Sequence, residues 1–105
     1  MAERVFFLNT LREGADPNEY EDWIRRVDYP VARRQPAIES YVVTRLEGLI
    51  QGDGSPPYQY LETIEVTSVD EYRVGLTGNE EMESLLREWS TYVESSVAVH
   101  GVVIE

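Results

Sequence analysis

The chain has 105 residues, 42% of them hydrophobic, with two Trp and seven Tyr. This is enough apolar material for one hydrophobic core, so we expect a single domain over residues 1–105. Nine basic and 20 acidic side chains give a net charge of −11, which repels phosphate backbones and acidic membrane surfaces and argues against nucleic acid or membrane as a partner.

The first elements are a strand and a helix. Arg4 to Asn9 is short, aromatic and β-branched, which is typical of a strand. A helix then begins at Pro17, because Asp16 suits its N-cap and Glu19 completes a capping box. Its apolar residues recur at helical spacing: Tyr20, Trp23, Ile24 and Val27. Pro30 disfavours helical geometry in the preceding residue, so this helix is expected to end near Tyr29.

The middle of the chain alternates turns and strands. Residues 31–36 read as a turn or a short helical piece, and residues 38–46 as a strand. Residues 48–57 contain three Gly and two Pro, which predicts a flexible connection that is either a plain loop or a lid. Residues 58–66 form the next predicted strand.

The last third begins with helical signals. Ser68 and Glu71 form a second capping box, Gly78 interrupts the helical pattern, and Asn79 can cap a new helix. That helix carries an apolar stripe: Met82, Leu85, Leu86, Trp89, Tyr92 and Val93. Residues 97–104 form a final strand that is apolar on both faces apart from His100, so both faces are expected to be covered.

The element order is strand, helix, strand, strand, helix, strand, which is the α+β ferredoxin-like pattern with helices on one face of a four-stranded antiparallel sheet. The predicted spatial order of the strands is fourth, first, third, second. Apolar residues occur at both strand parities, as in Phe6 and Phe7 or Val102 and Val103. We therefore expect a homodimer, a dimeric α/β barrel in which a second copy covers the free sheet face.

Three strand residues are the predicted catalytic candidates. His100 is the only imidazole, and it is either an acid–base group or a hydrogen-bonded core residue. Tyr60 and Glu62 share the apolar strand face with Ile64, so the pKa of Glu62 is expected to be raised. The alternative for Glu62 is a salt bridge to Arg45. Asn9 is a predicted substrate-binding residue that completes a polar cluster with His100 and Glu62, or else it is a turn residue at the strand end.

Five further residues are predicted to bind a ligand. Trp23, Trp89 and Tyr92 lie on the helix stripes and form either an aromatic wall for a flat apolar ligand or ordinary core. Tyr29 and Arg33, with Arg34, follow the first helix, where the guanidinium groups would hold an anionic group or the partner subunit. The alternatives are that these residues lie on the surface or that the Arg side chains form ion pairs with the acidic C-terminal part of the chain.

The residue inventory narrows the chemistry. All nine basic residues are Arg and there is no Cys, so lysine Schiff bases, disulfides and thiolate sites are excluded. The single His and the scattered carboxylates match no metal-binding spacing, and no nucleotide-binding motif is present, so we expect neither metal nor cofactor. Without a signal segment at the N-terminus, a cytoplasmic location is expected.

Three stretches, DYPVARRQPAIESYVVTRLEG, PPYQYLETIEV and SSVAVHGVVIE, resemble the REDY-like (HapK) family over nearly the whole chain. The resemblance implies a dimeric α/β barrel and a role in the biosynthesis of prodiginine or other bacterial secondary metabolites, including antibiotics. The leading hypothesis is a small cofactor-independent enzyme or auxiliary factor acting on an aromatic intermediate between sheet and helices. The alternatives are a non-catalytic carrier dimer and a cofactor-free monooxygenase.

Overall fold

A computed structural model describes residues 1–105. Its elements, in chain order, are β1 (Glu3–Leu11), α1 (Pro17–Trp23), the π-helical segment η1 (Ile24–Asp28), α2 (Tyr29–Arg33), β2 (Ile38–Arg45), β3 (Tyr60–Val66), α3 (Val69–Gly75), α4 (Glu80–Tyr92) and β4 (Val93–Val102). The four predicted strands are all present, and β4 starts four residues earlier than predicted.

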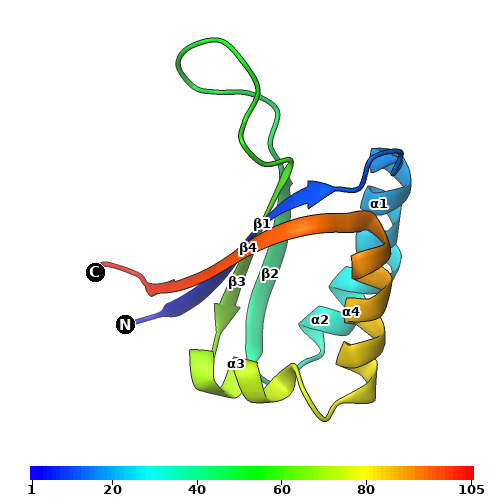
Figure 1. Cartoon of the computed structure of the whole chain (residues 1–105). Coiled ribbons are helices and arrows are strands. Elements are labelled where there is room, and N and C mark those ends of the chain that lie inside the picture. Colours follow the sequence, from blue (N-terminus) through cyan, green and yellow to red (C-terminus); the bar gives the residue numbers. More distant parts are fainter.

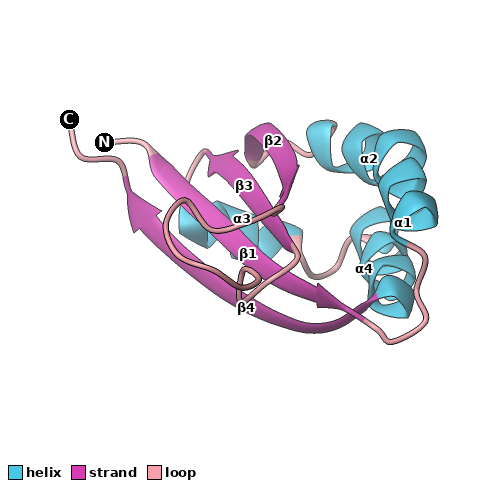
Figure 2. Cartoon of the chain, turned by 90° about the horizontal axis from the view of Figure 1, so that it is seen from above, coloured by secondary structure: helices cyan, strands magenta, loops and turns pink.

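The strands form one antiparallel sheet in the order β2-β3-β1-β4, which confirms the predicted order. Figures 1 and 2 show α1, α2 and α4 standing together on one side of this sheet. The architecture is therefore α+β and ferredoxin-like, as the sequence predicted. No helix is long and apolar enough to span a membrane.

Strand alternation separates a helix-facing side of the sheet from an outer side. On β3, Tyr60, Glu62, Ile64 and Val66 are buried, whereas the residues between them are only partly covered. The register places Phe7 beside Glu62 and Ala98, and Asn9 beside Tyr60 and Ser96, all on the helix-facing side. Two buried clusters fill the space between this side and the helices.

The first helix does not end at Tyr29 as predicted. Pro30 lies inside α2, because η1 precedes it and widens the helix by a π turn in which the Tyr29 N–H donates to Ile24 O. A proline ring inside an α-helix collides with the carbonyl of the fourth residue before it, and a π turn shifts that carbonyl away. The helix therefore continues to Arg33, and Asp28 lies within it.

The predicted N-caps are confirmed. The side chain of Asp16 accepts from the Asn18 N–H, that of Ser68 from the Glu71 N–H, and that of Asn79 from the N–H groups of Glu81 and Met82. Gly78 has a φ of +67°, a backbone conformation that favours glycine and allows the chain to turn between α3 and α4.

Residues 46–59 form a loop that projects away from the sheet and helices (Figure 1). Ile50 near its tip is fully exposed. Within one chain this segment therefore covers no site, and the lid alternative is not supported at the level of a single copy.

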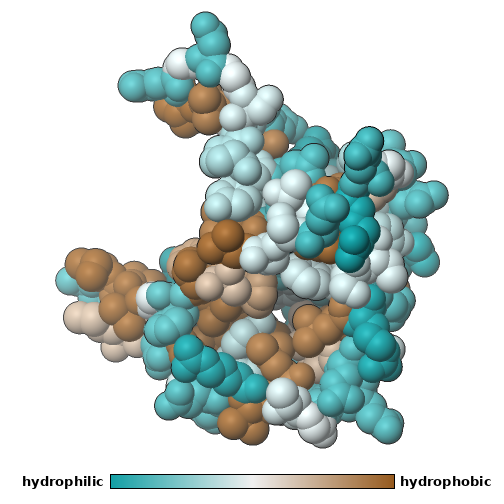
Figure 3. Space-filling model, in the orientation of Figure 1, coloured by the Kyte–Doolittle hydropathy of each residue, from teal (hydrophilic) through white to brown (hydrophobic).

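The outer side of the sheet carries exposed apolar residues. Val42 is 50% exposed, and Val97 and Val99 are each 45% exposed. Figure 3 shows brown, apolar surface near the termini and along the strands. The expectation that both faces of the last strand are covered is wrong for a single chain, because residues 94–100 of β4 are exposed.

Candidate functional site

Glu62 is the centre of a buried polar cluster. It projects from β3 toward the helices and is only 6% exposed. Asn9 Nδ2 donates to Glu62 Oε2 at 2.5 Å, and Trp89 Nε1 donates to the same oxygen at 3.2 Å. The other oxygen, Oε1, lies 3.0 Å from the Tyr41 hydroxyl.

A second carboxyl group, that of Asp28, shares the Tyr41 hydroxyl. Asp28 is the last residue of η1 and is 4% exposed. Its Oδ2 atom lies 2.5 Å from the Tyr41 hydroxyl oxygen. We call Asp28, Tyr41 and Glu62 the acid cluster.

The acid cluster requires an extra proton. A tyrosine hydroxyl has one hydrogen and donates to one acceptor only, yet the Tyr41 oxygen lies within hydrogen-bond distance of two carboxyl groups. Both contacts are satisfied when one carboxyl is protonated and donates to the Tyr41 oxygen, while Tyr41 donates to the other. The pair therefore holds one shared proton in its fully hydrogen-bonded state.

Burial raises the pKa of both carboxyl groups. It brings the pKa of Asp28 to about 7, against the lowering effects of the Tyr41 hydrogen bond and the Arg33 charge. It also raises the pKa of Glu62, although hydrogen bonds from Asn9, Tyr41 and Trp89 act in the opposite direction. Arg33 favours the charged form of Asp28, and the hydrogen bonds from Asn9 and Trp89 favour that of Glu62, so the two carboxyl groups share one proton across the Tyr41 hydroxyl.

Two groups position the ends of this cluster. Ser96 Oγ donates to Asn9 Oδ1 at 2.6 Å, which fixes the Asn9 amide so that its Nδ2 points to Glu62. At the other end, Arg33 donates to the Tyr41 carbonyl oxygen at 2.8 Å. A continuous hydrogen-bonded chain thus runs from Ser96 on the edge strand to Asp28 in the interior.

The acid cluster faces an apolar cavity of about 40 Å³ between sheet and helices. A water molecule occupies about 30 Å³ in the liquid, so the cavity holds one water or a small terminal group of a ligand. Apart from the acid cluster, its lining is apolar and aromatic: Phe7, Ala32, Ile38, Ile64, Tyr72, Met82, Leu85, Leu86 and Trp89. A small reactive group placed there would meet a proton donor and a proton acceptor with little water present.

Comparison with known proteins decides the family. Residues 3–104 match the sequence family described as REDY-like protein HapK. The chain belongs to the HapK family. No curated protein gives a match.

Solved structures share the fold of this HapK-family chain. HapK from Hahella chejuensis superposes with a TM-score of 0.79 at 22% identity, covering 97% of this chain and 92% of that one. A dimeric ferredoxin-like protein of unknown function from Thermobifida fusca gives 0.73 at 17% identity, covering 98% and 92%. Hydroxynitrile lyase from Passiflora edulis gives 0.78 at 13% identity, covering 99% and 94%.

Three of the predicted site residues of this HapK-family chain meet in space: Glu62, Asn9 and Trp89. The turn reading of Asn9 is wrong, since Asn9 lies inside β1 and is completely buried. The Glu62–Arg45 salt bridge is also wrong. Arg45 lies opposite Tyr60 in the register and pairs with Glu21 at 2.8 Å.

Tyr60, Trp23 and Tyr92 lie elsewhere in the interior. Tyr60 donates its hydroxyl hydrogen to Glu21 at 2.7 Å and forms no hydrogen bond with Glu62. Its ring packs at 5.0 Å from Tyr20, which also contacts Trp23 and Tyr92. We call Tyr20, Trp23, Tyr60 and Tyr92 the aromatic cluster; it lines no part of the cavity beside Glu62.

His100 does not join the polar cluster. It lies opposite Val5 on the exposed edge strand β4 and forms no hydrogen bond with Glu62 or Asn9. The buried-core reading is wrong as well, because its side chain is exposed in the single chain. Its catalytic role stays a prediction.

Tyr29 and Arg33 pack around Tyr41 and do not line the inner cavity. The Arg33 guanidinium carbon lies 3.9 Å from the Tyr29 ring centre, and that ring meets Tyr41 edge-on at 5.4 Å. Arg34 instead pairs with Glu81 at 2.8 Å, which confirms pairing with the acidic C-terminal part for this residue.

The sequence reasoning missed Asp28, Tyr41 and Ser96. Asp28 lies four residues after Ile24 and eight after Tyr20, so helical spacing was a signal for it, but the predicted helix end at Tyr29 obscured the pattern. Strict alternation from Ile38 would place Tyr41 on the opposite side of the sheet, but the strand pairing is irregular between Ile38 and Ser40. A bulge of this kind breaks strict alternation and places Ile38 and Tyr41 on the same face.

Proposed function

We propose that this HapK-family chain is a cofactor-independent acid–base enzyme of bacterial secondary-metabolite biosynthesis, acting on a largely apolar, prodiginine-like or aromatic intermediate between sheet and helices. The observation that carries the proposal is the buried acid cluster facing an apolar cavity. Two carboxyl groups with raised pKa values around one hydroxyl can give and accept a proton near neutral pH.

Each residue of the cluster has a proposed role. In this proposal Glu62 supplies the shared proton, and Asp28, whose charged form Arg33 favours, accepts one. Tyr41 lies between them and relays the proton. Asn9 and Trp89 are positioning residues that hold Glu62 Oε2. One protein of the same fold is a hydroxynitrile lyase, which supports an enzymatic role without specifying the reaction.

The proposed functional form is a homodimer. The outer side of the sheet presents apolar residues that a single copy leaves exposed, including Val42, Val97 and Val99. Removing apolar surface from water contributes about 25 cal/mol of favourable free energy per Å², so association through such a face is favoured. Proteins of the same fold described as dimeric support this assembly.

The rival function is a carrier that binds the intermediate without reaction, and the apolar lining of the cavity favours it. The test is complementation of a gene deletion in the source bacterium with Glu62→Gln, followed by metabolite analysis. Glutamine keeps the shape of Glu62 but has no carboxyl proton to donate. We expect the intermediate to accumulate because its conversion slows by at least about tenfold, the change in rate that a loss of about 1.4 kcal/mol in transition-state stabilisation produces.

The matched control is Glu65→Gln on the same strand, whose side chain points to the outer side and pairs with Arg4 at 2.7 Å. It should restore normal product levels. His100→Ala should also restore them if the acid cluster alone moves the proton. Full product formation by a folded Glu62→Gln variant would favour the carrier and reject acid–base catalysis.

A further inference from the structure

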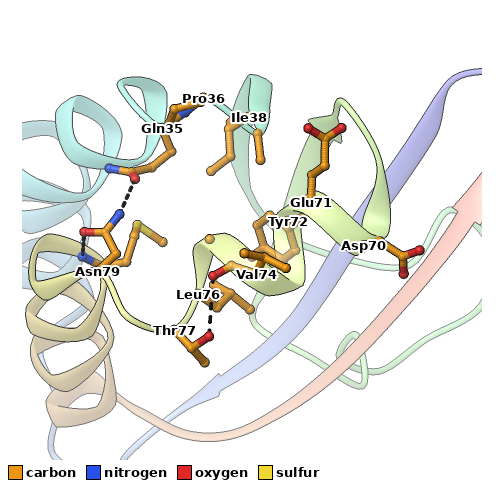
Figure 4. Close-up of a pocket in the computed structure, with 13 residues that line it drawn as sticks. Gln35, Pro36, Ile38, Asp70, Glu71, Tyr72, Val74, Leu76, Thr77 and Asn79 are labelled. Carbon is orange, nitrogen blue, oxygen red and sulfur yellow. Dashed lines mark hydrogen bonds between the residues drawn. The ribbon is translucent and has the colours of Figure 1, made fainter.

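A larger pocket lies directly outside the cavity. It has a volume of about 500 Å³ and is formed between the turn joining α2 to β2 and the helix α3. Figure 4 shows Gln35, Pro36 and Ile38 on one side of this pocket and Tyr72, Val74 and Leu76 on the other. We call it the outer pocket. Volumes of this order are typical of sites for small molecules.

The outer pocket and the inner cavity share a wall. Ile38, Tyr72 and Met82 line both spaces, and all three are at least nine-tenths buried. A shift of these side chains would join the two spaces, and one of the three is a flexible methionine. The outer pocket therefore adjoins the acid cluster through three side chains rather than through backbone.

We propose that the outer pocket and the inner cavity form one bipartite binding site for an elongated, uncharged or cationic aryl compound. This inference rests on the proposed function and adds its substrate class. The ring system occupies the outer pocket, and a small polar end group passes Ile38, Tyr72 and Met82 to reach Tyr41 and Glu62.

The size of each space sets the shape of the ligand. The inner cavity of about 40 Å³ takes only a carbonyl, hydroxyl or similar end group, whereas the outer pocket of about 500 Å³ has room for a ring system. A spherical ligand that fills the outer pocket could not reach the acid cluster.

The charge of the rim selects against anions. Asp70 and Glu71 line the outer pocket, and no Arg does. Arg73 pairs with Asp70 at 3.6 Å from outside this lining. A carboxylate or sulfonate on the ring system would face two acidic side chains, and the pocket lining contains no basic side chain to bind it.

The remaining polar groups of the pocket are already occupied. The Asn79 amide donates to Gln35 Oε1 at 2.8 Å, and the Gln35 amide donates to Val31 O and Glu81. The ring system is therefore held by apolar contacts. The ligand is oriented by its end group, which reaches the Tyr41 hydroxyl and the Glu62 carboxyl beyond the shared wall.

Gly75 offers a way to fill the outer pocket. It lines the pocket from α3, and a Cβ atom added there meets no heavy atom within 4 Å. Its φ lies outside the left-handed region, so Gly75→Phe introduces a side chain without backbone strain. Gly48→Phe is the matched control, because Gly48 has the same freedom but lies in the projecting loop.

The probe is acetyl(dimethylamino)naphthalene, a neutral fluorescent aryl ketone, titrated into the purified full chain. We expect a blue-shifted, saturable signal whose Kd rises about tenfold or more in Gly75→Phe and is unchanged in Gly48→Phe. Dimethylaminonaphthalene sulfonate, the anion of similar size, should bind about tenfold more weakly than the ketone. Equal ketone affinity in the two glycine variants, or tighter sulfonate binding, would overturn the proposal.

A second variant tests whether the end group passes the wall. Tyr41→Phe removes the hydroxyl of the acid cluster but leaves the outer pocket intact, so the emission maximum of the bound ketone should shift as its carbonyl loses the polar hydroxyl beside it. An unchanged maximum would mean that the outer pocket is a separate site. Neither measurement depends on turnover. If the protein passes both tests but Glu62→Gln leaves product formation unchanged, the proposed function is rejected and the binding site is retained.

Discussion

The aromatic cluster and the acid cluster, both buried between sheet and helices, have different roles. The aromatic cluster stacks four rings at centroid distances of 5.0 to 6.0 Å and sends the Tyr60 hydroxyl outward to Glu21. The acid cluster buries two carboxyl groups around one hydroxyl and leaves a cavity beside them. The first arrangement gains free energy from apolar burial. The second incurs a desolvation cost that a purely structural core would avoid.

This contrast decides between two readings of the aromatic helix residues. The sequence predicts either a ligand-binding wall or ordinary core, and Trp23 and Tyr92 are core because they pack against other rings of the same chain. The residues that line the cavity are both aliphatic and aromatic, and Trp89 is the only one of the three predicted wall residues among them. Truncation of a ring in the aromatic cluster should therefore lower stability, and changes in the acid cluster should alter protonation and chemistry.

The largest effect is expected from Trp23→Ala. Trp23 is 4% exposed and contacts Tyr20 and Tyr92, so truncation leaves a large cavity and lowers the free energy of unfolding by about 3–5 kcal/mol. Urea unfolding followed by circular dichroism measures this loss. Trp23→Phe should retain most of the stability, and an Ala variant as stable as the parent would show that the aromatic cluster is not the main packing unit.

Tyr41→Phe should have an intermediate effect. It deprives Asp28 and Glu62 of their common hydrogen-bond partner, and an unsatisfied buried polar group costs about 1–3 kcal/mol. Urea unfolding measures this change as well. Tyr29→Phe is the control, because it also removes one tyrosine hydroxyl, which accepts from the Val43 N–H at 2.9 Å outside the acid cluster. If both substitutions cost the same, Tyr41 has no special role.

The acid cluster should also make stability depend on pH. Because burial raises the pKa of Asp28 to about 7 from its ordinary 3.8, the folded chain binds the proton more tightly than the unfolded chain between these values. Stability is then greatest near the lower value and falls toward neutral pH, with a slope of up to about 1.4 kcal/mol per pH unit for one proton. The raised pKa of Glu62 acts in the same direction.

Urea unfolding at about pH 5 and about pH 7.5 measures this slope. Asp28→Asn keeps an acceptor for Tyr41 but cannot ionise, so its stability should change less between the two values. A slope that is equal in the parent and in Asp28→Asn would show that Asp28 does not titrate between these two pH values.

The smallest effect is expected from Tyr20→Phe in the aromatic cluster. The Tyr20 hydroxyl is buried without a hydrogen-bond partner, so its removal eliminates an unsatisfied polar atom while the ring stays in place. We expect the free energy of unfolding to stay constant or to rise by up to about 1 kcal/mol. Thermal unfolding detects this change, and a clear loss of stability would indicate a partner for the hydroxyl.

The element order, the three N-caps and the helix-facing position of Glu62 could be predicted from the sequence alone. Caps depend on side chains within three residues of a helix start, and strand alternation depends only on neighbouring residues. These features are local. The sequence also carries the family likeness, in residues 28–48, 56–66 and 95–105, and this likeness is confirmed.

Only the tertiary structure decided the composition of the site. Tyr41 is separated from Asp28 by 13 residues and from Glu62 by 21, and their meeting depends on the π turn before Pro30 and on the irregular pairing after Ile38. The π turn and the irregular pairing each rotate all later side chains of the same element to a different direction. Hydrophobic periodicity in the sequence does not reveal either irregularity. The sequence therefore determined which faces are buried, while the packing of η1 against β2 and β3 determined which polar groups share a proton.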